Sequence, residues 1–240
     1  MPYPHAFFAL QLTFADKIAA LSGQSFQEMV LRYTAMYRIL GLDWSLDPSH
    51  PVWQDYLQGM RQAPADAEWS HQVYLARCDQ IPTHPTPNWG CFAYTYSPEW
   101  PSVHLHFANV DTSGVGPLSH QRQQARLAEL RAMFTHIKQT HPDTIEVCGG
   151  SWLYNRPAYT RLFPPEYAAS AQADRPHLIA RALWGQFLHH DEQINQEIAS
   201  LFLQRLSALE DMEQYAQCFP YQVLLTKAPI GLFYRFYGID

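Results

Sequence analysis

The sequence predicts an α/β (α+β) fold, a single domain with a mixed, mostly antiparallel central sheet flanked by helices. Hydrophobic residues make up 47% of the 240 residues, which is enough for a sizeable packed core. Short runs rich in aromatic and β-branched residues lie between longer stretches whose apolar residues recur at helical spacing. Within residues 103–167 these patterns predict a strand, a glycine-containing turn, a long helix, a second strand and then an aromatic segment.

Residues 1–80 are predicted to form a mainly helical layer. The apolar run at 7–12 predicts a short strand, followed by a helix that Thr13 caps and Gly23 ends. Ser25 and Glu28 have the spacing of a capping box, so a helix is expected from there to residue 40. Two further helices are expected at 52–60 and 66–77.

Residues 89–240 are predicted to carry the sheet and its flanking helices. Aromatic and β-branched runs at 89–96 and 102–109 are separated by a proline-containing turn, which predicts a hairpin. The longest helix is expected at 119–140, with an apolar stripe facing the core. The remaining expected elements are strands at 144–148, 182–188 and 221–226, helices at 157–163 and 191–209, and an aromatic tail at 230–237 that packs on the sheet.

Composition and charge narrow the range of partners. The net charge is −6 and the 16 Lys and Arg residues are scattered, which argues against a nucleic-acid partner. A secretory signal requires basic residues near its start, but no Lys or Arg precedes Lys17. No apolar run approaches the roughly 20 residues that span a bilayer. Four cysteines without a C-x-x-C pair favour reduced thiols. We therefore expect a cytoplasmic protein with a small-molecule ligand and no membrane partner; the sequence does not predict its oligomeric state.

The turn before the long helix contains Gly114 and Gly116. Backbone N–H groups at the start of a helix bind phosphate groups, and a glycine turn lets such a ligand approach. Arg122 and Arg126 lie in the first turns of the helix, where the helix dipole disfavours a cation unless an anion is bound nearby. The alternative is an ordinary turn beside a solvated helix face on which Glu129 pairs with Arg122 or Arg126.

The order of elements resembles the GNAT family of acyltransferases, most closely over residues 103–163. In that family the glycine-bearing turn binds the pyrophosphate of coenzyme A. The resemblance implies that Ser113, Gly114, Gly116 and Arg122 hold coenzyme A or acyl-CoA. The turn departs from the family pattern, because Asp111 stands where Gln or Arg is usual and Pro117 has no N–H to donate.

The segment after the second strand extends the resemblance. Asn155 and Ala158 are similar to an Asn and a small residue that follow this strand in the family. The family's tyrosine, which protonates the leaving thiolate, would fall near Leu162, and Tyr159 is an approximate substitute. The whole chain also resembles a group of uncharacterised bacterial proteins that carry the Ser-Trp-Leu-Tyr-Asn stretch, which implies no reaction, cofactor or catalytic residue.

The stretch from Ser151 through Trp152 and Tyr154 to Asn155 is a candidate substrate-binding wall. Trp and Tyr provide apolar surface with one polar group each, and the serine and the asparagine could orient a substrate amide. The alternative is a corner of the core in which the two aromatic side chains pack and Asn155 caps the next helix.

His104 and His106 are two residues apart on a predicted strand, so they share a face of the sheet. One of them could act as a base near neutral pH, or both could bind a metal if a third ligand were near. Structural histidines are the alternative. The sequence predicts no metal site, since residues 189–192 lack the H-E-x-x-H spacing that places two imidazoles on one helix face.

Three functions remain open at this point. The first is acyl transfer from acyl-CoA to an amine, with Tyr159 as proton donor and His104 or His106 as base. The second is a non-catalytic small-molecule-binding protein on a degenerate GNAT-like fold, favoured by Asp111 and Pro117. The third is a metal enzyme that uses His104 and His106.

Overall fold

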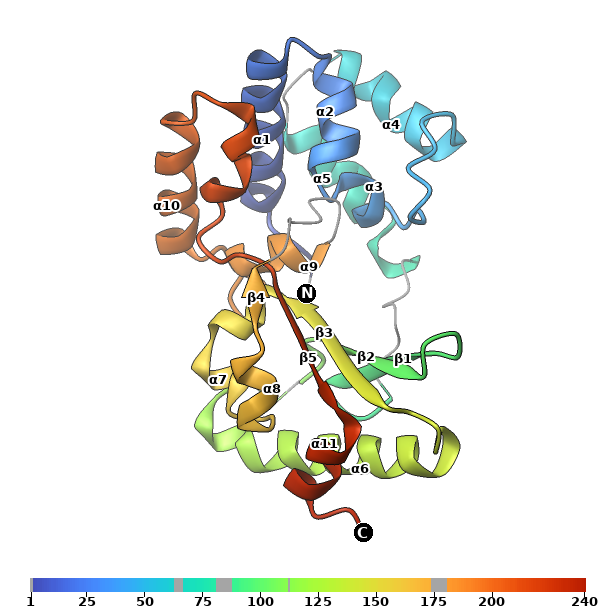
Figure 1. Cartoon of the computed structure of the whole chain (residues 1–240). Coiled ribbons are helices and arrows are strands. Elements are labelled where there is room, and N and C mark those ends of the chain that lie inside the picture. Colours follow the sequence, from blue (N-terminus) through green and yellow to red (C-terminus); the bar gives the residue numbers. More distant parts are fainter. Residues whose placement is uncertain (1, 63–66, 81–87, 112, 174–180) are drawn as a thin grey trace. The chain divides into compact units, whose positions relative to one another are not determined.

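The computed structural model describes residues 2–62, 67–80, 88–111, 113–173 and 181–240. Backbone contacts divide the chain into two compact units, which Figure 1 shows. The first unit comprises Met1–Pro82 and Arg175–Pro220, and the second comprises Thr83–Asp174 and Tyr221–Asp240. Among the helices of the described residues, none combines the length and the apolar character that crossing a membrane requires.

The described part of the first unit is helical. Its longest helix, α1 (His5–Ser22), packs against α2, α5 and α10. Rings from three parts of the chain form its aromatic core: Phe14, Trp184, Phe187, Phe202 and Phe219. The other helices are α2 (Phe26–Tyr33), α3 (Met36–Ile39), α4 (Pro51–Gln62), α5 (Ala67–Leu75), α9 (Arg181–Trp184), α10 (Gln196–Ser207) and 3₁₀ turns at Cys78–Gln80, Gly185–Phe187 and Met212–Cys218.

Several predictions for the first unit hold and others are wrong. Gly23 has φ 68° and ends α1, and the Ser25 side chain accepts a hydrogen bond from the backbone N–H of Glu28, as the capping box requires. The Glu28 carboxylate binds Arg32. The helix predicted to residue 40 is divided into α2 and α3 at Thr34, whose backbone is extended.

The strands predicted at 7–12 and 182–188 are wrong, because both segments are helical. A short apolar run fits a buried strand and a buried helix equally well, and both runs are buried on several sides here. Thr13 is not a cap either, since its hydroxyl donates to the carbonyl of Ala9 within α1.

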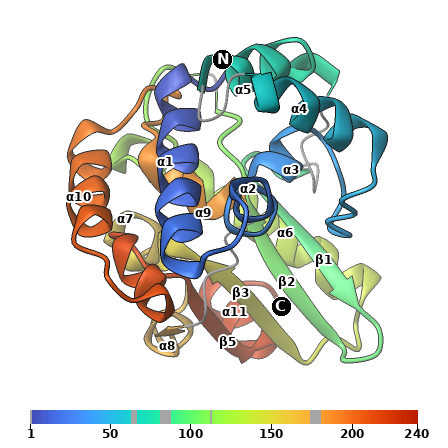
Figure 2. The same ribbon diagram turned by 90° about the horizontal axis from the view of Figure 1, so that it is seen from above.

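The second unit contains one five-stranded mixed sheet with the strand order β1-β2-β3-β5-β4. Figure 2 shows the first four of these strands side by side. Only β2 and β3 are parallel, and the other three pairings are antiparallel. The strands are β1 (Phe92–Ser97), β2 (Ser102–Phe107), β3 (Glu146–Ser151), β4 (Gln172–Ala173) and β5 (Leu224–Pro229). The predicted mixed, mostly antiparallel sheet and its hairpin are confirmed.

Helices of the second unit cover one face of this sheet. The crossover from β2 to β3 is the long α6 (Gln123–Thr140), preceded by a 3₁₀ turn at His120–Arg122, which confirms the helix predicted there. The aromatic tail is the helix α11 (Ile230–Tyr237), and it packs against α6 and β5 as predicted. The other elements are the 3₁₀ turn Trp152–Asn155, α7 (Pro157–Thr160) and α8 (Pro165–Ala169).

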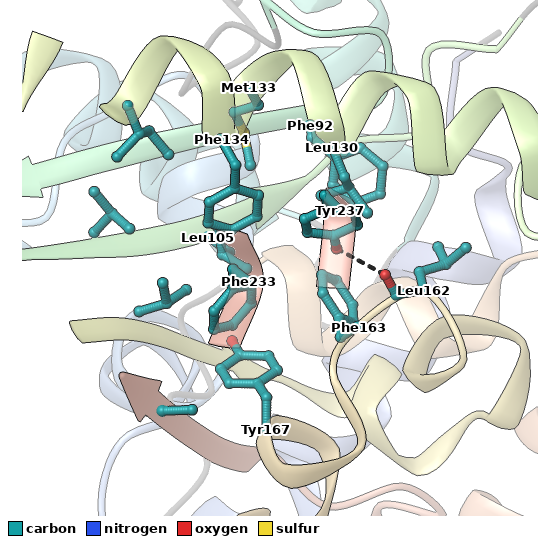
Figure 3. Close-up of a cluster of buried hydrophobic side chains, with 14 of the residues drawn as sticks. Phe92, Leu105, Leu130, Met133, Phe134, Leu162, Phe163, Tyr167, Phe233 and Tyr237 are labelled. Atoms are coloured by element: carbon teal, nitrogen blue, oxygen red, sulfur yellow. Dashed lines mark hydrogen bonds between the residues drawn. The ribbon is translucent and has the colours of Figure 1, made fainter. Parts of the chain in front are cut away.

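The core of the second unit lies between these helices and the sheet (Figure 3). Alternation along the strands turns Val103, Leu105 and Val147 into the core and His104, His106 and Cys148 to the opposite face. Phe134 of α6 stacks on Phe233 of α11 with ring centroids 4.8 Å apart. Two tyrosine hydroxyls, those of Tyr154 and Tyr167, press against the backbone of Gly149, where any side chain would overlap them.

We predict that Gly149→Ala strongly destabilises the protein. The new methyl group would overlap both tyrosine hydroxyls, whose rings are buried, so the unfolding free energy should fall by about 1–3 kcal/mol. Gly231→Ala is the matched control, because no heavy atom lies within 4 Å of the added Cβ in α11 and its stability should be unchanged or slightly higher. Urea denaturation measures both, and equal midpoints would contradict the packing described here.

Candidate functional site

The loop between β2 and α6 contains Gly114 and Gly116 and precedes the 3₁₀ turn at His120–Arg122 that leads into the helix. Gly114 has φ 75°, a left-handed conformation that glycine adopts without strain. The amides of Gly114, Val115 and Gly116 donate no hydrogen bond to any residue that the structure describes. The amide of Ser113, in contrast, is occupied, because it donates to Asp111 Oδ1 at 2.9 Å. Among the described residues, three consecutive amides of this loop therefore have no acceptor.

Asp111 occupies the two arginines at the start of the long helix. Its Oδ2 lies 2.7 Å from Arg122 Nε and 3.1 Å from Arg126 Nη2, and its side chain is 3% exposed. Hydrogen bonds from the side chain and backbone of Ser113, followed by the Arg122 guanidinium, hold the pKa of the Asp111 carboxyl well below its usual range. Arg122 was expected to bind a phosphate group, but it is paired with the Asp111 carboxylate instead. The Arg122 side chain is 33% exposed, so part of it still faces solvent.

Arg126 and Glu129 extend this ion network to the first strand. Glu129 Oε1 lies 2.6 Å from Arg126 Nη2, which is the alternative pairing that the sequence left open. Glu129 Oε2 accepts from the backbone N–H of Cys91, and Arg126 Nη1 contacts the Cys91 thiol. Gly90 has φ 57°, and the Glu129 carboxylate occupies the place of any side chain there. Sequence reasoning noted Asp111 only as a departure, although the spacing of Asp111 and Ser113 fits an Asx turn.

The parallel strands β2 and β3 part before they end. Their register runs from the pair Ser102–Glu146 to the pair Leu105–Gly149. Both strands continue beyond this last pair, β2 to Phe107 and β3 to Ser151. The two strands are therefore not paired with each other over their last two residues, before the chain of β2 continues towards the loop that contains Gly114.

His104 and His106 lie on one face of the sheet, as predicted, with ring centroids 5.1 Å apart. A Cβ added to Gly150 would lie 3.8 Å from His104 Cε1, so the imidazole of His104 extends towards β3 at the point where the strands part. Burial lowers the pKa of His104, which keeps the ring neutral at pH 7 and able to accept a proton. His106 is instead hydrogen-bonded to Thr95 Oγ1 at 2.8 Å.

Cys148 is the neighbour of His104 on the same face of the sheet, a juxtaposition that the sequence did not indicate. Its thiol hydrogen-bonds to Glu146 Oε2 at 3.4 Å. Burial, together with Glu146, raises the pKa of Cys148 to about 11. The thiol stays protonated at neutral pH, so this pair does not resemble an activated nucleophile. Among the described residues, no group of three or more His, Cys, Asp or Glu side chains is arranged to hold a metal ion.

Tyr159 and Tyr154 lie on the opposite, core face. Tyr159 is 2% exposed, and its ring packs against Phe107 and Phe163. Burial raises the pKa of Tyr159 well above its usual value. The Tyr154 hydroxyl is 2.7 Å from that of Tyr167. The structure thus places Tyr154 within the core, on the other side of the sheet from His104.

Ser151 and Asn155 have structural partners. The Ser151 hydroxyl accepts from the backbone N–H of Leu153 and caps the 3₁₀ turn. The alternative predicted that the Asn155 side chain caps α7, and this is wrong. The side chain instead donates 2.7 Å hydrogen bonds to the carbonyls of Trp152 and Gln222. Trp152 is partly exposed and stacks on Tyr221 with ring centroids 5.7 Å apart.

The chain was compared with protein-family models, curated proteins and solved structures, and no match was found in any of the three.

We predict that Asp111→Asn destabilises the protein and removes part of its acid sensitivity. The loss of the carboxylate leaves Arg126 with one carboxylate partner instead of two, which should cost about 1–3 kcal/mol at pH 7. Because folding lowers the pKa of Asp111, its contribution is complete above the unfolded value of about 4 and is lost as the pH falls below it. Denaturation from pH 7 to pH 3 should give a shallower decline for the variant; parallel profiles would contradict the assignment.

Proposed function

We propose that the second unit is a GNAT-like fold that transfers an acyl group from acyl-CoA to an amine. The observation that carries the proposal is the parting of β2 and β3 after Leu105 and Gly149, beside a glycine loop with free amides. A parallel strand pair joined through a long helix, with a gap between the strand ends, is the arrangement that such a cofactor requires. The mixed sheet order around this pair supports the resemblance.

The residues of the loop suit the phosphates of coenzyme A in part. The unoccupied amides of Gly114 and Gly116 lie before the positive end of α6, where an anion is favoured. Ser113 contributes less than expected, because Asp111 occupies its amide. Arg122 contributes only if it leaves Asp111.

A bound acyl-CoA would supply the activated acyl group as a thioester. His104, neutral at pH 7 and directed towards the parted strands, would take the proton that the amine loses as it attacks. Tyr159, on the other face of the sheet, would donate a hydrogen bond to the departing thiolate. The proton lost by the amine goes to the imidazole, and the sulfur leaves as a thiolate with the electron pair of the broken C–S bond.

A second candidate function is non-catalytic binding of a small molecule on a degenerate form of this fold. Two observations favour it: the Asp111 carboxylate pairs with both Arg122 and Arg126, and Tyr159 is buried against other aromatic rings. The ligand would then be apolar or aromatic and would contact the stacked pair of Trp152 and Tyr221.

The binding step is tested by placing a charge in the loop. Gly114→Asp and Gly114→Asn have nearly the same shape, both tolerate a positive φ, and no heavy atom lies within 4 Å of the added Cβ. We predict that coenzyme A and acetyl-CoA bind the wild-type chain, and that the aspartate variant binds at least roughly tenfold more weakly than the asparagine variant. Calorimetric titration measures both. Absence of binding to the wild-type chain at millimolar ligand would reject acyl transfer and leave the second candidate.

The catalytic step is tested with the two histidines. We predict that His104→Gln lowers kcat by about 10²–10⁴-fold, the usual contribution of a general base, while His106→Gln on the same strand has a small effect. Because the pKa of His104 is lowered, the wild-type rate should decline only below about pH 6.5, and this acid limb should be absent from the His104 variant. Thiol release from acetyl-CoA across a panel of amines gives the rates. Equal losses in the two variants would show that His104 has no special role.

A further inference from the structure

Arg161, the residue that follows α7, lies against the segment that begins the long helix. Its Nη2 donates to the Leu118 carbonyl at 2.7 Å. Its Nη1 is 3.2 Å from Nδ1 and 3.1 Å from Nε2 of His120. An imidazole lone pair lies in the ring plane on one nitrogen, so a donor at equal distance from both nitrogens is aligned with neither. The guanidinium is therefore only partly satisfied by its neighbours.

Two buried polar atoms of this region lack partners. Ser119 Oγ and Arg161 Nε are buried, and like Arg126 Nε neither has a hydrogen-bond partner among the residues that the structure describes. Ser119 stands in the chain between Leu118 and His120, the two residues that Arg161 contacts, yet its side chain caps no backbone N–H of the 3₁₀ turn that follows. Because buried polar atoms are nearly always paired, these two atoms indicate a missing group.

The charge balance shows what kind of group fits. Arg122 and Arg126 share the carboxylate of Asp111. Within the described ranges, no Asp or Glu lies at ion-pair distance from Arg161. The segment also precedes the positive end of a long helix. The guanidinium of Arg161 and the imidazole of His120 are therefore in contact, the hydroxyl belongs to the residue before His120, and no carboxylate among the described residues pairs with this arginine. This combination suits an anion with several acceptor oxygens.

We propose that Arg161, Ser119 and His120 form a subsite for a phosphate group. One phosphate oxygen would accept from Arg161 Nε and another from Ser119 Oγ, with the flat guanidinium providing the geometry that phosphate recognition favours. The subsite needs only a phosphate-bearing ligand, so it goes beyond acyl transfer. If the ligand is coenzyme A, the subsite proposal rests on the proposed function. Arg161 then supplies the positive charge that Arg122 does not.

Inorganic phosphate is the first probe. Thermal unfolding is followed as phosphate is added at constant ionic strength, with sodium chloride as the reference. The melting temperature of the wild-type chain should rise with phosphate and not with chloride. Arg161→Gln should weaken the dissociation constant roughly tenfold.

Two further variants separate binding from folding. Ser119→Ala removes a hydroxyl that has no partner, so it should leave the phosphate-free melting temperature unchanged or higher and still weaken phosphate binding several-fold. Arg131 is an exposed arginine of α6, and the Arg131→Gln variant should bind phosphate like the wild type. A wild-type response equal to that in chloride, or the same response in the Arg161 and Arg131 variants, would mean that a water satisfies these atoms and the subsite does not exist.

Coenzyme A is the second probe, and it identifies the source of the phosphate. A roughly tenfold loss of coenzyme A affinity in Arg161→Gln would place a cofactor phosphate in the subsite. Unchanged coenzyme A affinity together with lost binding of inorganic phosphate would assign the subsite to another phosphorylated ligand. Phosphate binding without any coenzyme A binding would reject the acyl-transfer proposal and leave the subsite in place.

Discussion

One carboxylate, that of Asp111, holds the start of the central helix against the sheet of the second unit. It binds Arg122 and Arg126 on consecutive turns. Arg126 also pairs with Glu129, which accepts a hydrogen bond from the backbone N–H of Cys91 just before the first strand. Arg126 is 3% exposed, and a buried guanidinium without partners would be strongly destabilising.

This ion network also limits how an anion could be recognised in the proposed function. Because Asp111 and Glu129 together balance the charges of Arg122 and Arg126, the start of the helix would offer a ligand mainly backbone dipoles, with Arg161 as a cation that has no carboxylate partner in the described residues. Backbone donors match the directions of phosphate oxygens without adding formal charge. A chain with a net charge of −6 does not attract an anion from a distance, so recognition depends on these short-range donors.

Local signals in the sequence predicted the parts of this fold that local interactions determine. Gly23 and Ser25 mark helix ends, and the hairpin and the long helix follow from their residue patterns. The strand predicted at 182–188 was wrong because its apolar residues meet rings from helices distant in sequence. Asp111 with Arg126, and His104 with Cys148, were missed for a similar reason, since each pair depends on how β2, α6 and β3 pack and on strand register.

Acyl transfer has two parts, removal of the amine proton and departure of the thiolate, and the residues on the two faces of the sheet support the first better than the second. Burial lowers the pKa of His104, so its imidazole is neutral at pH 7 and can accept a proton, and the ring lies beside Gly150 of β3. Tyr159 has a raised pKa, which makes it a weaker acid than a free phenol. A thiol has a pKa of about 8.5, so proton transfer from such a tyrosine to a thiolate is uphill, whereas a hydrogen bond to the developing charge is not. A thiolate is also stable enough in water to leave unprotonated. In the proposed reaction Tyr159 would therefore donate a hydrogen bond, and removal of the amine proton by His104 would be the step that depends most on the protein.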